Sequence, residues 1–408
     1  MMTCCKWSLV ILLLANSLYS QDKWGYTVYG YVKTDVMMDT RQTVSAREGH
    51  VLLYPKKKLL TEEINSPTLV DANDGLNFNI LSIQSRFGYK ITAPEFLGAK
   101  STGVLEGEYF GSTNTDVGSV RLRHGFLNLD WGQHKLLIGQ FWQPLVIDET
   151  YARVISFNTG IPFVAFGRNP QVKYTFQQDE LRLHLSAVTE RDFPSTGPDG
   201  ESSYYIRNAG LPMINFGAIY NDKNIYLAAN ACYKELKPRL ATEKNYIETT
   251  KSRGIIANAL ARYKTDDFYV TASALWGQNT YDLLMIGGYA VSAIDSVSGV
   301  WTYTPVDVSA LWLDAEYGKD LLLGIFLGYS KNHGAESEVV GKYFSRGDDI
   351  DYIYRISPRI VYNQGKTQFG AEFEYTSAAY GTKDKSGVVN ADYEVANLRI
   401  VLSASIFF

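Results

Sequence analysis

The chain ends in ANLRIVLSASIFF (residues 396–408), in which apolar and polar side chains alternate up to a closing pair of phenylalanines. Side chains two residues apart lie on the same face of a β-strand. One face therefore carries Leu398, Leu402 and Ile406, and the opposite face carries Arg399. Strict alternation of this kind predicts a strand with one apolar and one polar face. The rest of the sequence has to show what covers the apolar face.

The beginning of the chain has the features of a secretory signal peptide. A lysine precedes an apolar run from Leu9 to Ala15, and small residues then allow cleavage after Ser17 or after Ser20. The apolar run is too short for a helix that spans a membrane. We therefore predict a cleaved signal peptide over residues 1–20 and a single mature domain over residues 21–408.

The composition points to an all-β protein without disulfide bonds. The sequence holds 29 tyrosines and 34 glycines, which favours strands and turns. Cys232 is the one cysteine beyond the predicted signal peptide, so no internal disulfide is expected. The formal net charge of −4 comes without a basic stripe, so no nucleic-acid partner is expected. After residue 20 no apolar run approaches the length of a membrane helix.

Alternating segments recur along the whole mature chain, and sixteen of them are predicted as strands. They cover about residues 24–36, 76–92, 102–112, 119–131, 133–142, 170–177, 180–189, 213–221, 223–233, 254–264, 267–277, 308–318, 320–331, 350–362, 366–378 and 395–408. The segment over residues 119–131 changes phase near His124, which indicates a β-bulge or an error in its assignment.

The connections between these segments alternate between short and long. Short ones such as NDKN (221–224) and NQGK (363–366) have the composition of tight hairpin turns. Long polar loops, such as 37–75, 143–169 and 278–307, lie between them. A barrel in an outer membrane has tight turns on its periplasmic side and long loops outside.

The predicted fold is therefore all-β, a closed antiparallel transmembrane β-barrel of about sixteen strands. In such a barrel the apolar face of the last strand meets lipid. The last strand must also pair with the first, because an open sheet edge is not tolerated within a bilayer.

Three stretches resemble known outer-membrane proteins. The terminal Phe408 on an alternating strand resembles the signal that the barrel assembly machinery recognises. LLIGQFWQP (136–144), followed after a long loop by GRNPQVKYTF (167–176), resembles strand motifs of Gram-negative porins, including phosphate-selective and dicarboxylate-type porins. GYVKTDVMMDTRQTVSAREGH (30–50) is similar to porins of Bacteroides-like bacteria. The resemblance implies a sixteen-stranded water-filled pore, usually a homotrimer, whose third external loop folds inward.

The third external loop covers residues 143–169 and is the predicted pore constriction. Its candidate charged residues are Asp148, Glu149, Arg153 and Arg168. The loop lacks the lysine-rich ladder expected of a phosphate-selective porin. This departure puts phosphate selectivity in doubt.

The polar faces of the strands supply candidate residues for the wall of the pore. Charges on such a wall set ion preference. By alternation the basic candidates are Arg121, Arg123, Lys173, Arg182, Arg355, Arg359 and Arg399, and the acidic ones are Glu106, Glu108, Glu372 and Glu374, with Asp314 and Glu316. Acids and bases fall on different strands, which predicts an electric field across the lumen. The alternative is that these are solvated wall residues without a selective role.

Aromatic residues near the predicted strand ends suit the interfacial girdles of a membrane barrel. The members of this set are Trp24, Tyr26, Trp131, Tyr263, Trp276, Tyr317 and Tyr362. The alternative role for aromatic residues is stacking on sugars inside the pore. For that role only Trp312 and Phe326 are candidates on central strands.

Other chemistry finds no support in the sequence. The five histidines show no metal-ligand spacing, and no nucleophile elbow or phosphate loop is present. We therefore expect no enzyme activity, no metal and no cofactor. PKKK (55–58) is a solvated loop or a contact for anionic lipopolysaccharide.

The leading hypothesis is an outer-membrane channel for passive diffusion of small hydrophilic, charged solutes. One alternative is a hydrophobic-substrate transporter of the fatty-acid type. That class has an N-terminal plug before its first strand, and a first strand near Trp24 leaves no room for one. The other alternative is a barrel-anchored adhesin or receptor that acts through its external loops.

Overall fold

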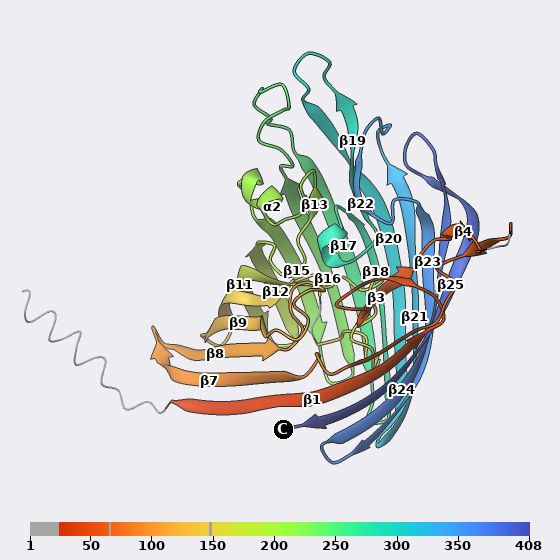
Figure 1. Cartoon of the computed structure of the whole chain (residues 1–408). Helices are drawn as coiled ribbons and strands as arrows, with labels where there is room; N and C mark the ends of the chain where they lie inside the picture. The colour runs from red at the N-terminus through yellow and green to blue at the C-terminus, as the bar shows by residue number, and fades with distance from the viewer. Residues whose placement is uncertain (1–23, 65–66, 147–148) are drawn as a thin grey trace, which may run out of the picture.

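A computed structural model describes residues 24–64, 67–146 and 149–408. The predicted signal peptide and Asp148 lie outside the described residues. The main sheet contains nineteen strands, of which β6, β19 and β22 are short pieces beside the wall, and the remaining sixteen form a closed antiparallel barrel (Figure 1).

The sixteen wall strands correspond one to one with the predicted segments. They are β1 (Gly25–Asp39), β7 (Arg86–Phe96), β8 (Ala99–Glu108), β9 (Arg121–Asp130), β10 (His134–Trp142), β11 (Arg168–Gln178), β12 (Leu181–Val188), β15 (Met213–Asn221), β16 (Ile225–Leu236), β17 (Ser252–Lys264), β18 (Phe268–Gln278), β20 (Trp301–Gly318), β21 (Leu321–Ala335), β23 (Ile350–Gln364), β24 (Thr367–Lys383) and β25 (Val389–Phe407). The prediction of an antiparallel sixteen-stranded barrel is confirmed.

One predicted strand, over residues 76–92, is interrupted. The structure divides it into β6 (Asn77–Leu81) and β7, which pair with successive parts of β1. In the break, the Ser85 hydroxyl accepts a hydrogen bond of 3.1 Å from the backbone N–H of Lys33. The side chain thus replaces a ladder bond, and the sequence pattern did not reveal this.

The first and last strands close the barrel. β25 pairs with β1 in register from Tyr31 opposite Phe407 to Asp39 opposite Arg399. The backbone N–H of Phe408 donates to the carbonyl of Gly30 at 3.0 Å, and Gly30 donates back at 3.2 Å. A Cβ atom at Gly30 would lie 2.2 Å from the carbonyl oxygen of Arg86, so only glycine fits at this junction.

The two faces of the wall differ as the alternation predicts. On β25 the outward Leu402 and Ile406 are exposed, whereas the inward Arg399 and Ser403 are buried. The seven predicted girdle aromatics are all exposed on the outside. Apolar side chains therefore cover the exterior of the barrel, and polar side chains line its interior.

A β-bulge explains the change of phase in β9. Glu106 lies opposite His124 and Gly107 lies opposite Leu122, so Arg123 is the extra residue of the bulge. Both Arg123 and His124 are consequently buried on the inner side. The predicted bulge is confirmed.

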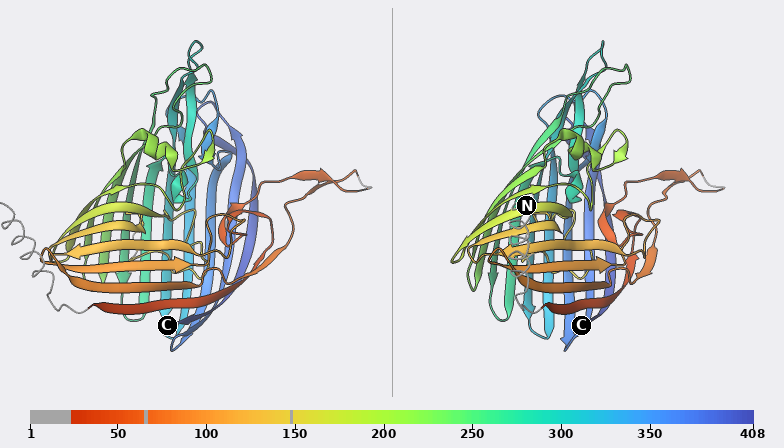
Figure 2. Two further views of the ribbon diagram at one scale, coloured as in Figure 1. Left: turned by 60° about the vertical axis from the view of Figure 1, so that its left-hand side comes forward. Right: turned by 90° about the vertical axis from the view of Figure 1, so that its left-hand side faces the viewer.

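Long loops gather at one end of the barrel and short turns at the other (Figures 1 and 2). Several long loops carry their own short elements. These are β2 (Thr43–Ala46), β3 (Val51–Pro55), β4 (Leu60–Glu62), β5 (Leu69–Asp71), β13 (Thr196–Gly197), β14 (Gly200–Glu201), α2 (Tyr204–Ala209), η1 (Tyr281–Leu283), β19 (Gly287–Ile294) and β22 (Tyr343–Arg346). Across the described ranges, no helix is long and apolar enough to cross a membrane.

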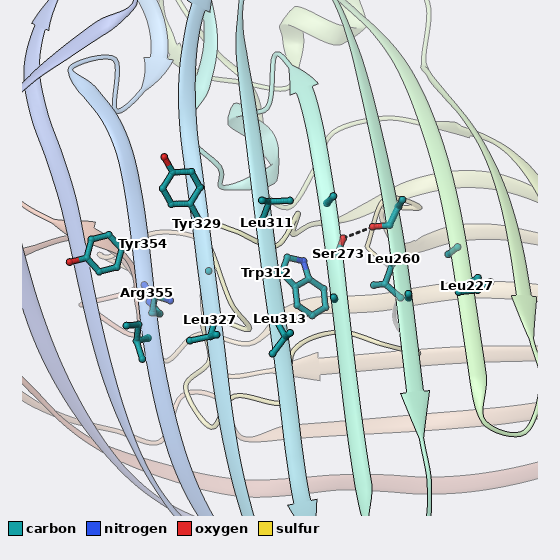
Figure 3. Close-up of a pocket in the computed structure, with 17 residues that line it drawn as sticks. Leu227, Leu260, Ser273, Leu311, Trp312, Leu313, Leu327, Tyr329, Tyr354 and Arg355 are labelled. Atoms are coloured by element: carbon teal, nitrogen blue, oxygen red, sulfur yellow. Dashed lines mark hydrogen bonds between the residues drawn. The ribbon is translucent and has the colours of Figure 1, made fainter.

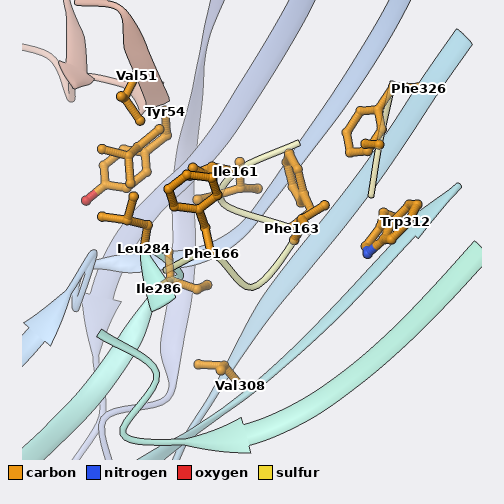
Figure 4. Close-up of a cluster of buried hydrophobic side chains, with 14 of the residues drawn as sticks. Val51, Tyr54, Ile161, Phe163, Phe166, Leu284, Ile286, Val308, Trp312 and Phe326 are labelled. Atoms are coloured by element: carbon orange, nitrogen blue, oxygen red, sulfur yellow. The ribbon is translucent and has the colours of Figure 1, made fainter. Parts of the chain in front are cut away.

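An apolar cluster occupies part of the barrel interior (Figure 4). The cluster joins residues of several loops to inward residues of the wall, among them residues of β20 and β21. They include Val51, Leu53 and Tyr54 of the first loop, Phe157, Ile161, Phe163 and Phe166 of the third, and Leu284 and Ile286 beside η1, with Val308, Trp312 and Phe326 on the wall. The third loop was expected to fold inward, whereas residues 37–75 and 278–307 were expected to be polar external loops, and the cluster itself was not predicted.

A buried charge cluster joins two external loops to the end of β16. The Lys234 ammonium lies 2.5 Å from the Asp282 carboxylate and 3.8 Å from that of Glu190. Two carboxylates thus share one lysine. The neighbouring Cys232 is a buried free thiol.

We expect this cluster to make the packing of the external loops sensitive to pH. Burial and the nearby Asp282 carboxylate raise the pKa of Glu190 to about 7, whereas an unfolded glutamate titrates near about 4.3. The protonated form is favoured in the packed loop. Its stabilisation is therefore fully present below about pH 4.3 and is lost as the pH rises through about 7.

Hydrogen exchange of the backbone amides after Glu190, corrected for intrinsic rates, would measure this effect. We expect faster exchange at pH 8 than at pH 5. Glu190→Gln, which imitates the protonated acid, should remove the difference. An equal pH dependence in the variant would show that another group is responsible.

Candidate functional site

The third loop lies across the interior of the barrel rather than outside it. Its backbone N–H groups donate to inward carboxylates, from Arg153 to Asp314 at 2.8 Å and from Ile155 to Glu372 at 2.6 Å. The Asn158 side chain donates to Glu374 at 2.5 Å. Two strands of the wall therefore hold the loop, and two of the predicted wall acids, Glu372 and Glu374, act as its acceptors.

Arg153 is the accessible cation of this loop. Its side chain is 48% exposed, and its Nη1 lies 3.0 Å from Oε1 of Glu316. The guanidinium carbon lies 3.7 Å from the ring centre of Tyr269, a stacking distance. Arg153 is therefore held in a defined position while it still faces open space.

Arg168 has a different environment, although the sequence analysis placed both arginines in the constriction. It begins β11, its side chain is only 1% exposed, and it lies 2.8 Å from Asp192 and 3.4 Å from Glu108. Strand β11 carries Arg168 into the wall and away from Arg153. Its contacts are those of a residue that joins a loop to the barrel.

Glu149 is bound to strand β12 of the barrel wall. Its two carboxylate oxygens accept hydrogen bonds of 2.6 and 2.8 Å from Arg182 of β12. A cavity of about 200 Å³ adjoins this pair, and Lys173 and His184 also line it. Three predicted site residues, Glu149, Lys173 and Arg182, are thus brought together.

Four arginines surround two glutamates on the inner face of β7, β8 and β9. Glu108 lies 2.6 Å from Arg121, 2.9 Å from Arg123 and 3.4 Å from Arg86. Glu106 lies 2.7 Å from Arg123. Arg168 completes the set, and Asp192 from the following loop pairs with both Arg121 and Arg168.

Ion pairs also connect the inward residues of β20, β23, β24, β25 and β1. Arg359 lies 2.6 Å from Asp314 and 3.2 Å from Glu316. Arg399 lies 2.7 Å from Asp39 of β1. Arg355 lies 3.7 Å from Glu374. It also donates hydrogen bonds to backbone carbonyls of two loops. These predicted wall residues are therefore buried and paired.

The structure differs from the predicted separation of acids and bases. The acids of β8 lie beside the bases of β9, and Asp314 of β20 reaches Arg359 of β23. Burying a charge without a partner is costly, so inward acids and bases on nearby strands pair instead of forming two opposed walls. The alternation predicts whether each side chain points inward or outward. It does not predict which strand carries the side chain that it contacts.

A cavity of about 390 Å³ lies between the third loop and the short-turn end of the barrel. Its charged lining consists of Lys33, Arg86, Arg123 and Arg153 with a single carboxylate, Glu316. Aromatic residues also line it: Tyr31, Trp142, Tyr151, Phe157, Phe166 and Phe407. The cavity therefore presents mostly cations, while Glu108 and Asp35, which pair with them, are buried behind it.

A larger hollow of about 780 Å³ lies on the outer face of β16 to β23 (Figure 3). Small outward alanines at residues 259, 261, 272 and 274 form its floor, and larger side chains such as Leu311 and Tyr329 form its sides. Its lining is almost wholly apolar. This hollow belongs to the apolar exterior of the barrel.

The sequence analysis missed Asp192 and did not select Lys33 or Asp35. Lys33 and Asp35 lie two residues apart on the inward face of β1, so alternation carried the signal that would have found them. Asp192 lies in a loop without periodicity, and nothing in the sequence pointed to it. In the described part of the chain, no group of three or more His, Cys, Asp or Glu side chains is arranged to hold a metal ion.

Comparison with known sequences gives little. No protein-family model matches the chain. A stretch of 124 residues is 25% identical to the protein translocase subunit SecA of Granulibacter bethesdensis, and it covers 30% of this chain but only 13% of that protein. So small a share of the SecA chain shows no family relationship.

Comparison with solved structures is more informative. The outer membrane channel DcaP of Acinetobacter baumannii superposes with a TM-score of 0.67 at 17% identity, over 95% of this chain and 99% of that one. The anion-selective porin from Comamonas acidovorans gives 0.57 at 10% identity, over 95% and 100%. OmpT of Vibrio cholerae, in a trimer form, gives 0.55 at 13% identity, over 95% and 100%.

This chain has the fold of the outer-membrane porins. The likeness extends over nearly the whole chain, so the predicted porin resemblance is confirmed at the level of the fold. At these identities the porin fold carries no information on the solute, and the phosphate-selective or dicarboxylate subtype is not established.

Proposed function

We propose that the chain is an outer-membrane porin that allows small hydrophilic solutes to diffuse passively. Three features support this: a closed barrel with an apolar exterior, a charged interior, and a third loop held across that interior by Asp314, Glu372 and Glu374. In this proposal the loop forms the constriction and its charges select among solutes.

We further propose that the channel prefers anions. The observation that carries this proposal is the asymmetric lining of the 390 Å³ cavity, with four cationic side chains and one carboxylate. Two carboxylates that pair with these cations, Asp35 and Glu108, do not line the cavity, whereas Glu316, the partner of Arg153, does. Arg153 is the most exposed of the inward charges on the third loop.

Planar-bilayer recording of the refolded protein tests both proposals. Large, stable conductance steps are expected, and in a salt gradient the reversal potential should have the sign of anion preference. A folded barrel without current would contradict the channel. A reversal potential of the opposite sign would contradict only the anion preference.

The remaining predictions about partners extend this proposal. A trimer form among the structural neighbours supports a homotrimer. The outward apolar surface suits lipid and lipopolysaccharide as surroundings, and the exposed Phe408 suits recognition by the barrel assembly machinery. No catalytic role is proposed for any residue.

A further inference from the structure

We infer that the first external loop is the second half of the constriction, and that it closes the interior together with the third loop. The inference rests on the proposed channel function. The part of the first loop concerned is the β2–β3 hairpin, and three sets of contacts connect it to the third loop. Sequence analysis treated this hairpin as part of an ordinary surface loop.

The first connection is Arg355, an inward residue of β23. Its Nη1 donates to the carbonyl of Ile161 in the third loop at 2.7 Å. Its Nη2 donates to the carbonyls of Leu52 and Leu53 in the hairpin at 3.4 and 3.3 Å. The guanidinium also lies over the ring of Phe163, 5.5 Å from its centre. One buried side chain of the wall thus holds both loops through their backbones.

The second connection runs from β1. Lys33 donates to the carbonyl of Ile155 in the third loop at 2.8 Å and pairs with Asp35 at 2.9 Å. The same Oδ2 atom of Asp35 lies 2.9 Å from Nε2 of His50, at the tip of the hairpin. His50 is fully buried, and its ring lies 5.6 Å from that of Phe157 in the third loop.

The third connection is direct apolar packing. Val51 and Tyr54 of the hairpin belong to one buried cluster with Ile161 and Phe166 of the third loop (Figure 4). On the far side of the third loop, Phe163 packs against Phe326 of the wall, with ring centres 6.1 Å apart. Apolar side chains therefore extend from one loop through the other to the barrel wall.

An apolar constriction hinders the passage of hydrated ions even where its walls do not touch, because a narrow hydrophobic passage holds little water. With the hairpin in place, solutes must pass a barrier made by two loops. Without the hairpin, one side of this barrier is gone and the charged cavity below opens toward the long-loop end. The first loop should therefore limit both conductance and the size of admitted solutes.

The test is a hairpin deletion. Thr43 and Pro55 are paired across β2 and β3, so a Gly-Gly turn can join them in place of residues 44–54. The matched control removes residues 61–70 in the same way between the paired Leu60 and Asp71 of the β4–β5 hairpin. The described residues of the two strands of that second hairpin are exposed, apart from the half-buried Asp71, and none of them belongs to the apolar cluster.

Single-channel conductance and the uptake of uncharged sugars of graded size into liposomes are the measurements. We expect deletion of residues 44–54 to raise conductance several-fold and to admit larger sugars, while the control deletion changes neither. Arg355→Met in the full-length chain removes the hydrogen bonds to both loops without removing any backbone. It should lengthen the time that the channel stays open. This variant tests the inference even if the deletion does not fold.

The outcomes separate this inference from the proposed function. Equal conductance in the full-length chain and the deletion, together with an unchanged open time in Arg355→Met, would overturn the role of the first loop and leave the porin in place. Folded barrels of every variant without current would overturn the porin itself.

Discussion

Glu108→Gln should destabilise the barrel more than any other single substitution of an interior charge. The side chain of Glu108 is fully buried and lies within 3.4 Å of four arginines. Its removal leaves those four guanidinium groups with Glu106 and Asp192 as their ion-pair partners among the described residues. Taking one partner from a buried ion pair costs about 3–5 kcal/mol, because the remaining charge is buried without compensation.

Urea unfolding of the barrel in lipid vesicles, followed by its mobility in gels with and without heating, would measure this loss. Glu180→Gln is the matched control, because Glu180 is exposed in a short turn. Adding Arg121→Gln to Glu108→Gln should restore part of the stability, since it removes one uncompensated cation. Unfolding of Glu108→Gln at the same urea concentration as the unsubstituted protein would contradict the argument.

Arg153→Gln should change ion selectivity, whereas Arg168→Gln should change stability. Arg153 faces the cavity, and its loss removes one of four cations from the lining. The reversal potential in a salt gradient should therefore move toward zero. Arg168 is buried between Asp192 and Glu108. Its substitution should lower the urea midpoint and leave the reversal potential of the folded fraction unchanged.

Lys223→Gln provides the control for selectivity, because this lysine is exposed in a short turn away from the cavity. It should leave the reversal potential as it is. A change of equal size in Lys223→Gln and Arg153→Gln would mean that the whole electrostatic field of the protein, and not the cavity, selects the ion. A change in Arg168→Gln alone would place the selective cation in the wall.

Alternation was sufficient to predict the wall because a two-residue period is a local property of the chain. The inward facing of Arg399 and the outward facing of Leu402 follow directly from their spacing. The same rule indicated a bulge or an error of assignment near His124, and the structure shows a bulge with Arg123 as its extra residue. The alternation of short and long connections then fixed the strand count and separated the two ends of the barrel.

The interior arrangement could not be predicted in this way, because it depends on contacts between residues far apart in sequence. Ion pairs such as Arg121 with Asp192 join a strand to an aperiodic loop. The apolar residues of the first loop, Val51 to Tyr54, have no period that distinguishes a buried hairpin from an exposed one. Contacts that form across the closed barrel determine which loops fold into its interior.

The pairing of Tyr31 with Phe407 has a consequence for how the protein is made. Every other neighbouring pair of wall strands is adjacent in sequence, but this last seam joins the two ends of the chain. The ring therefore closes only when β1 and β25 are both present and paired. Until then β1 presents a free edge of unpaired backbone groups, which is a template for aggregation.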